Sequence, residues 1–153
     1  MLKLIEESNF NIFDELVQDY EEEFSPLTGK KKSHEGKYSV DVDWRPPNVG
    51  YYWEEDSHVV GFCIVDLVDN FWDIAEFYVI PAYRMKKIGK KMAFSIFQKH
   101  QGQWQVRQIL GAESAQKFWR RIISDFTNGN YIEMQIDDAK WGQVVCQRFV
   151  NST

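Results

Sequence analysis

The stretch from Ile74 to His100 constrains the fold most, because it joins a strand pattern to a helix pattern through a basic turn. Glu76–Ile80 is rich in aromatic and β-branched residues, which predicts a strand. Pro81 ends that strand, since proline offers no N–H to a ladder. After the turn at Tyr83–Lys90, apolar side chains recur at helical spacing. They are Ile88, Met92, Ala93, Ile96 and Phe97.

This order of strand, cationic turn and helix N-terminus is typical of a phosphate site. The first amide N–H groups of a helix have no partner within the helix, and the helix dipole favours an anion beside them. We interpret the turn as a site for a phosphate-bearing cofactor. The alternative interpretation is a structural turn whose lysines are simply solvated.

The composition indicates a packed globular protein. At 153 residues, with 44% hydrophobic and 16% aromatic residues, the chain predicts a single domain over residues 1–153. The formal net charge of −5 argues against binding to a nucleic-acid backbone or an anionic membrane. It is compatible with a cationic substrate such as an amine.

Cysteine usage and the N-terminus predict a cytoplasmic protein. Cys63 and Cys146 have no metal-ligand spacing and are expected to be buried thiols, although a disulfide between them stays open. The first ten residues carry acidic side chains where a signal peptide would be apolar. No apolar run approaches membrane-spanning length, and no metal site is indicated.

The first half of the chain predicts a helix followed by a long loop and a pair of strands. Residues 10–24 carry apolar side chains at helical spacing, and Ser25-Pro26 is expected to stop the helix. Residues 27–47 are polar and irregular, which suits either a substrate lid or a mobile insertion. Val59–Leu67 is apolar on both faces, as a central strand would be. The strands of this half are expected at Leu2–Ile5, Tyr51–Glu54 and Val59–Leu67.

The second half predicts a further helix among strands. Gly102 is expected to end one element, and Ser114 is a plausible N-cap for a helix that Asn128-Gly129-Asn130 terminates. Strands are expected at Trp104–Leu110, Tyr131–Ile136 and Gly142–Val150. The order of elements predicts an α/β domain with a mixed, largely antiparallel central sheet.

At this point the residues resemble the Gcn5-related N-acetyltransferase (GNAT) family. Its acetyl-coenzyme A signature is a strand followed by Arg/Gln-x-x-Gly-x-Gly/Ala and a helix, which Arg84, Lys87 and Gly89 match in part. The block ESAQKFWRR, at residues 113–121, resembles the family's second signature. The element order fits from about residue 10 to the end. The resemblance implies a GNAT-like sheet flanked by helices, in which the fourth and fifth strands splay apart to form a cleft.

The resemblance also implies a site for acetyl-CoA. Backbone amides of the turn would hold the pyrophosphate, with Arg84 close by, while the backbone of the preceding strand pairs with the pantetheine arm. The cofactor-binding residues it implies are Tyr78, Val79, Ile80, Arg84, Lys86, Lys87, Ile88, Gly89 and Lys90.

Two departures from the family pattern bear on the chemistry. Lys87 replaces a glycine whose role is close backbone approach or a permissive φ, so it either adds a cation or crowds the site. Ala112 replaces the usual Asn, and Trp119 stands where many members carry the Tyr that protonates the leaving thiolate. An indole cannot serve as that acid.

The implied reaction is direct attack of a neutral amine on the thioester, and Glu76 is the candidate base. Its carboxylate could equally be fixed in a structural ion pair. The amide of Val79 or Ile80 could polarise the carbonyl, and Tyr78 and Tyr83 are candidate acids. His34, His58 and His100 are expected to be surface residues.

The sequence therefore predicts an acetyl-CoA-dependent N-acetyltransferase that acts on a primary amine of a small molecule or peptide. The alternative is a non-catalytic member that serves as an acyl-CoA sensor or protein-interaction module. No nucleic acid or membrane partner is expected, and a homodimer is possible. Acceptor identity is expected to depend on residues 27–50 and the final hairpin.

Overall fold

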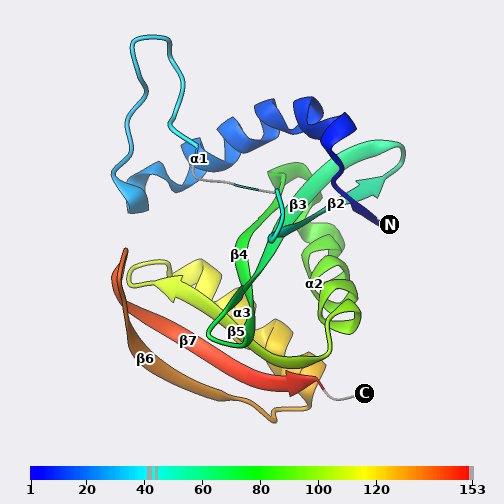
Figure 1. The fold of residues 1–153 in the computed structure, drawn as a ribbon, viewed down its shortest axis with the longest axis vertical. Coiled ribbons are helices and arrows are strands. Elements are labelled where there is room, and N and C mark those ends of the chain that lie inside the picture. The colour runs from blue at the N-terminus through cyan, green and yellow to red at the C-terminus, as the bar shows by residue number, and fades with distance from the viewer. Residues whose placement is uncertain (41–42, 44, 152–153) are drawn as a thin grey trace.

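The computed structural model describes residues 1–40, 43 and 45–151, and it is built on one seven-stranded sheet (Figure 1). The strand order is β1-β2-β3-β4-β5-β7-β6. Only β4 and β5 run parallel, and every other neighbouring pair is antiparallel. The strands are β1 (Leu2–Leu4), β2 (Val49–Glu55), β3 (His58–Val68), β4 (Phe71–Val79), β5 (Gly102–Ile109), β6 (Ile132–Asp138) and β7 (Gly142–Asn151). The predicted mixed, mostly antiparallel α/β fold is confirmed.

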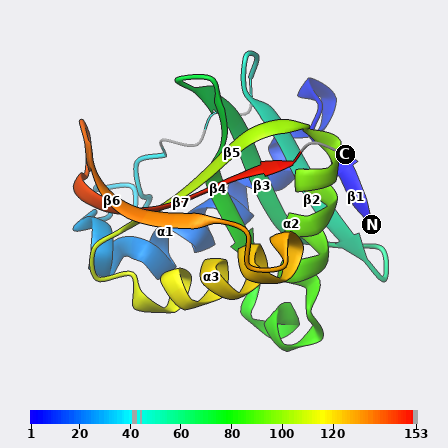
Figure 2. The same cartoon turned by 90° about the horizontal axis from the view of Figure 1, so that it is seen from below.

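Helices cover both faces of the sheet (Figures 1 and 2). They are the 3₁₀ helices η1 (Glu7–Phe13) and η2 (Pro81–Lys86) and the α-helices α1 (Asp14–Thr28), α2 (Ile88–Lys99) and α3 (Glu113–Thr127). Alternate residues of the central strand β3 serve the two faces. Phe62 and Ile64 pack with α1, whereas Cys63 and Val65 belong to the core beneath α2 and α3. Burial of each large side chain stabilises the fold by roughly 1.5–3 kcal/mol.

The first helix ends later than the sequence predicts, and Pro26 lies inside its last turn instead of stopping it. Proline has no N–H for the carbonyl four residues before it, which here belongs to Glu22. The Ser25 hydroxyl donates to that carbonyl instead, at 2.8 Å. The helix then runs on to Thr28 and ends at Gly29, whose φ of 74° is left-handed. Of the predicted loop over residues 27–47, positions 41–42 and 44 lie outside the described residues.

Three other predicted boundaries are also wrong. Gly102 begins β5, and the preceding helix ends at Lys99. Ala112 occupies the N-cap of α3, so Ser114 lies within the first turn. Ile80 follows the end of β4 and caps η2. Within residues 1–40, 43 and 45–151, none of the helices is both long and apolar enough to span a membrane.

The parallel strands β4 and β5 touch only at one end. They pair at Trp72 with Trp104 and at Asp73 with Gln105, and beyond these pairs they diverge. A bulge places Ala75 as an extra residue in β4, because Ile64 pairs with Glu76 while Val65 pairs with Ile74. A bulge bends its strand and increases the local twist. The bend therefore begins where β4 leaves β5, and it opens a cleft between them.

Gly61 is needed for the pairing of β3 with β4. A Cβ at this position would lie 2.6 Å from the carbonyl oxygen of Tyr78, which is fixed in the neighbouring strand. At Gly89 the nearest atoms to a Cβ would belong to a side chain, the Phe118 ring at 3.0 Å. We expect Gly61→Ala to lower the free energy of unfolding by about 1–3 kcal/mol.

Gly89→Ala is the matched control for this prediction, measured with the same urea denaturation. The Phe118 ring can shift, and alanine favours a helix over glycine by about 1 kcal/mol, so the loss should be smaller. Equal losses in the two variants would contradict the steric account of Gly61.

Candidate active site

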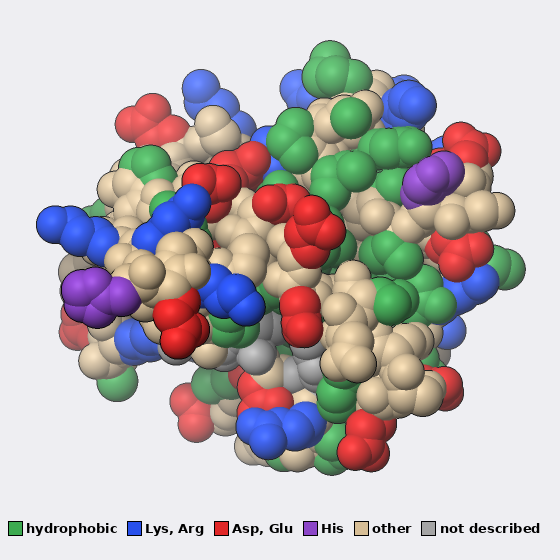
Figure 3. Space-filling model, turned by 90° about the horizontal axis from the view of Figure 1, so that it is seen from above, with side chains coloured by type: hydrophobic (Ala, Val, Ile, Leu, Met, Phe, Trp, Pro, Cys, Tyr) green, Lys and Arg blue, Asp and Glu red, His purple; other side chains and the backbone are tan. Residues whose placement is uncertain are grey.

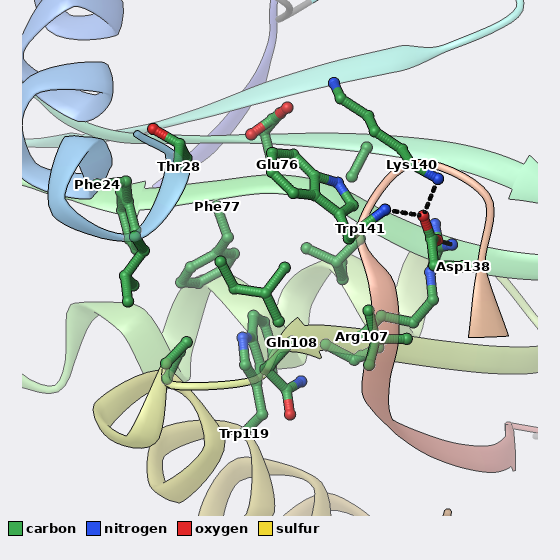
Figure 4. Close-up of a pocket in the computed structure, with 18 of the residues that line it drawn as sticks. Phe24, Thr28, Glu76, Phe77, Arg107, Gln108, Trp119, Asp138, Lys140 and Trp141 are labelled. Atoms are coloured by element: carbon green, nitrogen blue, oxygen red, sulfur yellow. Dashed lines mark hydrogen bonds and ion pairs between the residues drawn. The ribbon is translucent and has the colours of Figure 1, made fainter. Parts of the chain in front are cut away.

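A cavity of about 250 Å³ occupies the cleft between β4 and β5 (Figure 4). The C-terminal half of α1 and the β6–β7 turn form its outer walls, and the start of α3 closes its inner end. Aromatic side chains from α1, β4, α3 and the β6–β7 turn line it. They are Tyr20, Phe24, Phe77, Trp119 and Trp141.

Glu76 lies in the wall of this cavity, on the face of β4 that α1 covers. Its carboxylate accepts a hydrogen bond from the Tyr20 hydroxyl. Burial raises the pKa of Glu76 to about 7, although the Tyr20 hydrogen bond acts in the opposite direction. Burial and the adjacent carboxylate raise the pKa of Tyr20 well above its usual value. Glu76 can therefore take up or release a proton near neutral pH.

A second carboxylate, Glu21, lines the same cavity and is buried. Lys30 pairs with it at 2.8 Å and also donates to the carbonyl of Ser39 at 3.1 Å. Glu21 contributes to the raised pKa of Glu76, whereas the positive charges of Lys140 and Lys30 lower it. Lys30 therefore offsets part of the influence of Glu21 on Glu76.

Tyr78, the other candidate catalytic residue, does not line the cavity. Its ring is buried under α1, where it packs against Tyr20 and Phe62 at centroid distances of 5.5 and 6.1 Å. Burial raises the pKa of its hydroxyl. The structure thus places a different tyrosine, Tyr20, beside Glu76. Sequence periodicity placed Tyr20 on the apolar face of α1, but it carried no signal for this partner.

The backbone of β4 faces the cleft at alternate residues. The Ile80 N–H donates to the Val60 carbonyl of β3 at 2.9 Å, so it is already used. Because backbone groups alternate in direction along a strand, those of Phe77 and Val79 point into the cleft. Of the two amides considered for the thioester carbonyl, the geometry favours Val79.

Arg84 connects the turn after β4 to α1. Its Nη2 contacts both carboxylate oxygens of Glu23, at 2.7 and 2.6 Å, and its Nε donates to the Val79 carbonyl at 2.9 Å. Its guanidinium also stacks over the Tyr78 ring, 5.5 Å from the centroid. Sequence reasoning placed Arg84 near a pyrophosphate but did not find its carboxylate partner, which lies 61 residues away.

The turn from η2 into α2 gathers cations at a helix N-terminus. The first amides of a helix have no acceptor within the helix. In α2 no side chain caps them, and the first turn contains no acidic residue. Lys90 pairs with Asp125 of α3 at 3.0 Å, and Lys86 stacks over Tyr83 at 4.6 Å. Positive side chains oppose a helix dipole here, whereas a bound anion would satisfy both dipole and cations. The residues therefore fit a phosphate group.

The two glycine positions of the motif have different structural roles. Lys87, at the first, adopts the left-handed conformation with φ 60° and ψ 21°, which a glycine would adopt at lower cost. Gly89, at the second, lets α2 approach the Phe118 ring of α3. The lysine therefore keeps the shape of the turn and places a side chain where the family pattern has none.

The other residues singled out in the sequence lie in three settings. Ala112 and Trp119 are buried and line the cavity, and Trp119 packs edge-on against Phe77 at 4.8 Å. His100 interacts with the Tyr51 hydroxyl at 2.8 Å, whereas the other two histidines are exposed. Among the residues that the structure describes, no cluster of His, Cys, Asp or Glu has a geometry that could hold a metal ion. The two cysteines are free thiols.

Comparison with known proteins identifies the family. The model of the acetyltransferase (GNAT) family matches residues 12–122, so the chain belongs to this family. Acetyl-CoA is the cosubstrate of the family. A search of curated proteins found no match.

Solved structures share the fold at low sequence identity. One is a provisionally named streptothricin acetyltransferase from Bacillus anthracis str. Ames in complex with acetyl coenzyme A (TM-score 0.65, 13% identity, covering 98% of this chain and 97% of that one). Another is the aminoglycoside 6'-N-acetyltransferase from Enterococcus faecium (TM-score 0.62, 11% identity, 98% and 96%). A third is the ribosomal-protein-S18-alanine N-acetyltransferase from Escherichia coli (TM-score 0.62, 9% identity, 100% and 94%).

The conformation of Lys87 can be tested by two substitutions that remove the same charge. Lys87→Ala retains a Cβ at this left-handed position, whereas Lys87→Gly removes the Cβ. We expect the glycine variant to be the more stable by about 1 kcal/mol in urea denaturation, because only glycine adopts this φ without a steric penalty. An alanine variant of equal or higher stability would contradict the left-handed turn.

Proposed function

We propose that this protein transfers the acetyl group of acetyl-CoA to a primary amine of a small molecule or peptide. The observation that carries the proposal is the cleft between β4 and β5, which holds Glu76 in its wall and whose strand β4 leads into the cationic turn before α2. Family membership and the acetyl-CoA complex of a structural neighbour support the same cosubstrate.

The cosubstrate would lie along the open edge of β4. The first amides of α2, with Lys86, Lys87 and Lys90, would bind the pyrophosphate. The cleft-facing backbone groups of Phe77 would pair with the pantetheine arm as an added strand would, whereas the Val79 carbonyl already accepts the Arg84 Nε–H at 2.9 Å. The remaining residues expected at this site are Tyr78, Ile80, Arg84, Ile88 and Gly89.

The acceptor amine would enter from the side of α1 and the β6–β7 turn. Glu76 would take a proton from the ammonium, directly or through a water, and the neutral nitrogen would then attack the thioester carbonyl. The Val79 N–H faces the cleft and would stabilise the oxyanion. As the C–N bond forms and the C–S bond breaks, the thiolate leaves. Its proton must come from water or from a group other than Trp119.

A non-catalytic CoA sensor is the rival function, and two measurements separate the three possible outcomes. Isothermal titration with acetyl-CoA tests binding, and thiol release with a panel of amines tests transfer. Binding followed by thiol release supports the proposal. Binding without turnover supports the sensor, and no binding at millimolar cosubstrate excludes both functions.

The phosphate site can be tested with two lysines of the same helix. Lys90 lies in the first turn of α2 and Lys99 in its last. We expect Lys90→Gln to weaken acetyl-CoA binding in isothermal titration by roughly threefold, since a cation beside a bound phosphate contributes about 0.3–1 kcal/mol at an exposed position. Lys99→Gln should leave the affinity unchanged, and equal effects would exclude a phosphate at this end.

The role of Glu76 can be tested through the pH dependence of kcat/KM. A base must be deprotonated to act, and the pKa of Glu76 lies at about 7. We therefore expect kcat/KM to rise about tenfold per pH unit below this value and to level off above it. Glu76→Gln should lower the plateau and remove this dependence. Glu15→Gln, an exposed position on α1, should change neither.

Tyr20→Phe provides a second test of the same base. The Tyr20 hydrogen bond lowers the pKa of Glu76, so its removal should shift the rising limb to higher pH and keep the shape of the profile. If the rising part of the kcat/KM profile lies at the same pH in both Glu76→Gln and Tyr20→Phe as in the parent protein, another group is the base.

A further inference from the structure

Two large hydrophobic side chains are exposed at the walls of the cavity. Leu27 of α1 is 40% exposed and Trp141 of the β6–β7 turn is 41% exposed, and both line the cavity. Phe24, one helical turn before Leu27, lies in the same wall. Exposed apolar side chains that gather beside a cavity mark a surface for an apolar part of a ligand. The acceptor side of the cavity therefore offers an apolar contact surface.

The turn that carries Trp141 is held rigidly. The Asp138 carboxylate accepts the backbone N–H groups of Lys140 at 2.8 Å and Trp141 at 3.0 Å, and it pairs with Arg107 of β5 at 2.6 Å. In Figure 4 the Trp141 indole reaches across the cavity toward Glu76. These bonds hold the backbone of the turn, so the indole is presented beside the cavity, where a flat ring can stack on it.

The charges around the acceptor side largely cancel. Glu21 pairs with Lys30, and Asp138 pairs with Arg107, at 2.8 and 2.6 Å. Lys140 adds a further cation, with its Nζ 4.9 Å from the Trp141 ring centroid. On the outer face, acidic and basic side chains are likewise interspersed on the side where segment 29–40 lies (Figure 3). The lining thus has no excess of negative charge to hold a polycation, whereas a single ammonium group needs only Glu76.

We propose that the acceptor is a monoamine whose primary amino group is joined by a short chain to a flat aromatic ring. The ring packs on Trp141, with Leu27 and Phe24 on the opposite wall, and the chain carries the nitrogen to Glu76. This inference rests on the proposed transfer to an amine and specifies its substrate class. A polycationic acceptor is the alternative substrate class that the experiment below compares with it.

Thiol release tests the inference with tryptamine as the aromatic monoamine and spermidine as the polycation. We expect kcat/KM for tryptamine to exceed that for spermidine by roughly tenfold or more. Trp141→Ala should lower the tryptamine value about tenfold, Trp141→Phe should lower it less, and the spermidine value should barely change. Ile132→Ala, at a position 60% exposed on β6 that does not line the cavity, is the control and should match the parent protein.

Direct binding separates this inference from the proposed function. Isothermal titration of tryptamine into the CoA-loaded protein should show binding that Trp141→Ala weakens about tenfold. If that pattern appears without thiol release, the result supports the aromatic monoamine as the ligand and contradicts the proposed acetyl transfer. The inference is overturned if spermidine is the better acceptor, if tryptamine does not bind, or if Trp141→Ala affects both amines equally.

Discussion

The separation of β4 from β5 after Asp73 is the constraint on which the site depends. Asp73 is fully buried, accepts a hydrogen bond from Gln105 at 2.7 Å, and pairs with Arg107 at 2.9 Å. Burial raises the pKa of this carboxyl, whereas Arg107 opposes the rise. Because Asp73 is buried, loss of Arg107 would leave its carboxylate without a cationic partner at the closed end of the cleft. Arg107 extends the same connection to Asp138 and hence to the β6–β7 turn.

From that fixed point, the bulge at Ala75 produces the two halves of the site. Beyond the bulge β4 stays paired with β3, but among the described residues no strand pairs with its other edge, which runs toward the start of α2. The bulge also sets which side chain faces α1, so Glu76 meets Tyr20 in a partly dehydrated wall. The bulge thus sets both the course of β4 toward the cationic turn and the face on which Glu76 lies.

Local patterns in the sequence predicted the helices and strands, but they did not predict which distant side chains are in contact. The strand before Pro81 and the helix from Ile88 have strong local signals, as does the central strand β3, and the structure contains all three. Contacts between distant residues were not predictable: the Tyr20–Glu76 hydrogen bond spans 56 positions. The end of α1 was misjudged because a side-chain hydroxyl compensates for the missing N–H of Pro26. A single sequence does not show such compensation.

That compensation has a consequence for the motions of the cavity wall. In the last turn of α1, a hydroxyl that can rotate away replaces a backbone donor that cannot. A typical hydrogen bond contributes about 0.5–1.5 kcal/mol, so this turn opens more readily than an uninterrupted helix of the same length would. Leu27 and Thr28 lie in this turn and line the cavity. Hydrogen exchange should therefore be faster in this part of the wall, which can change shape without unfolding of the core.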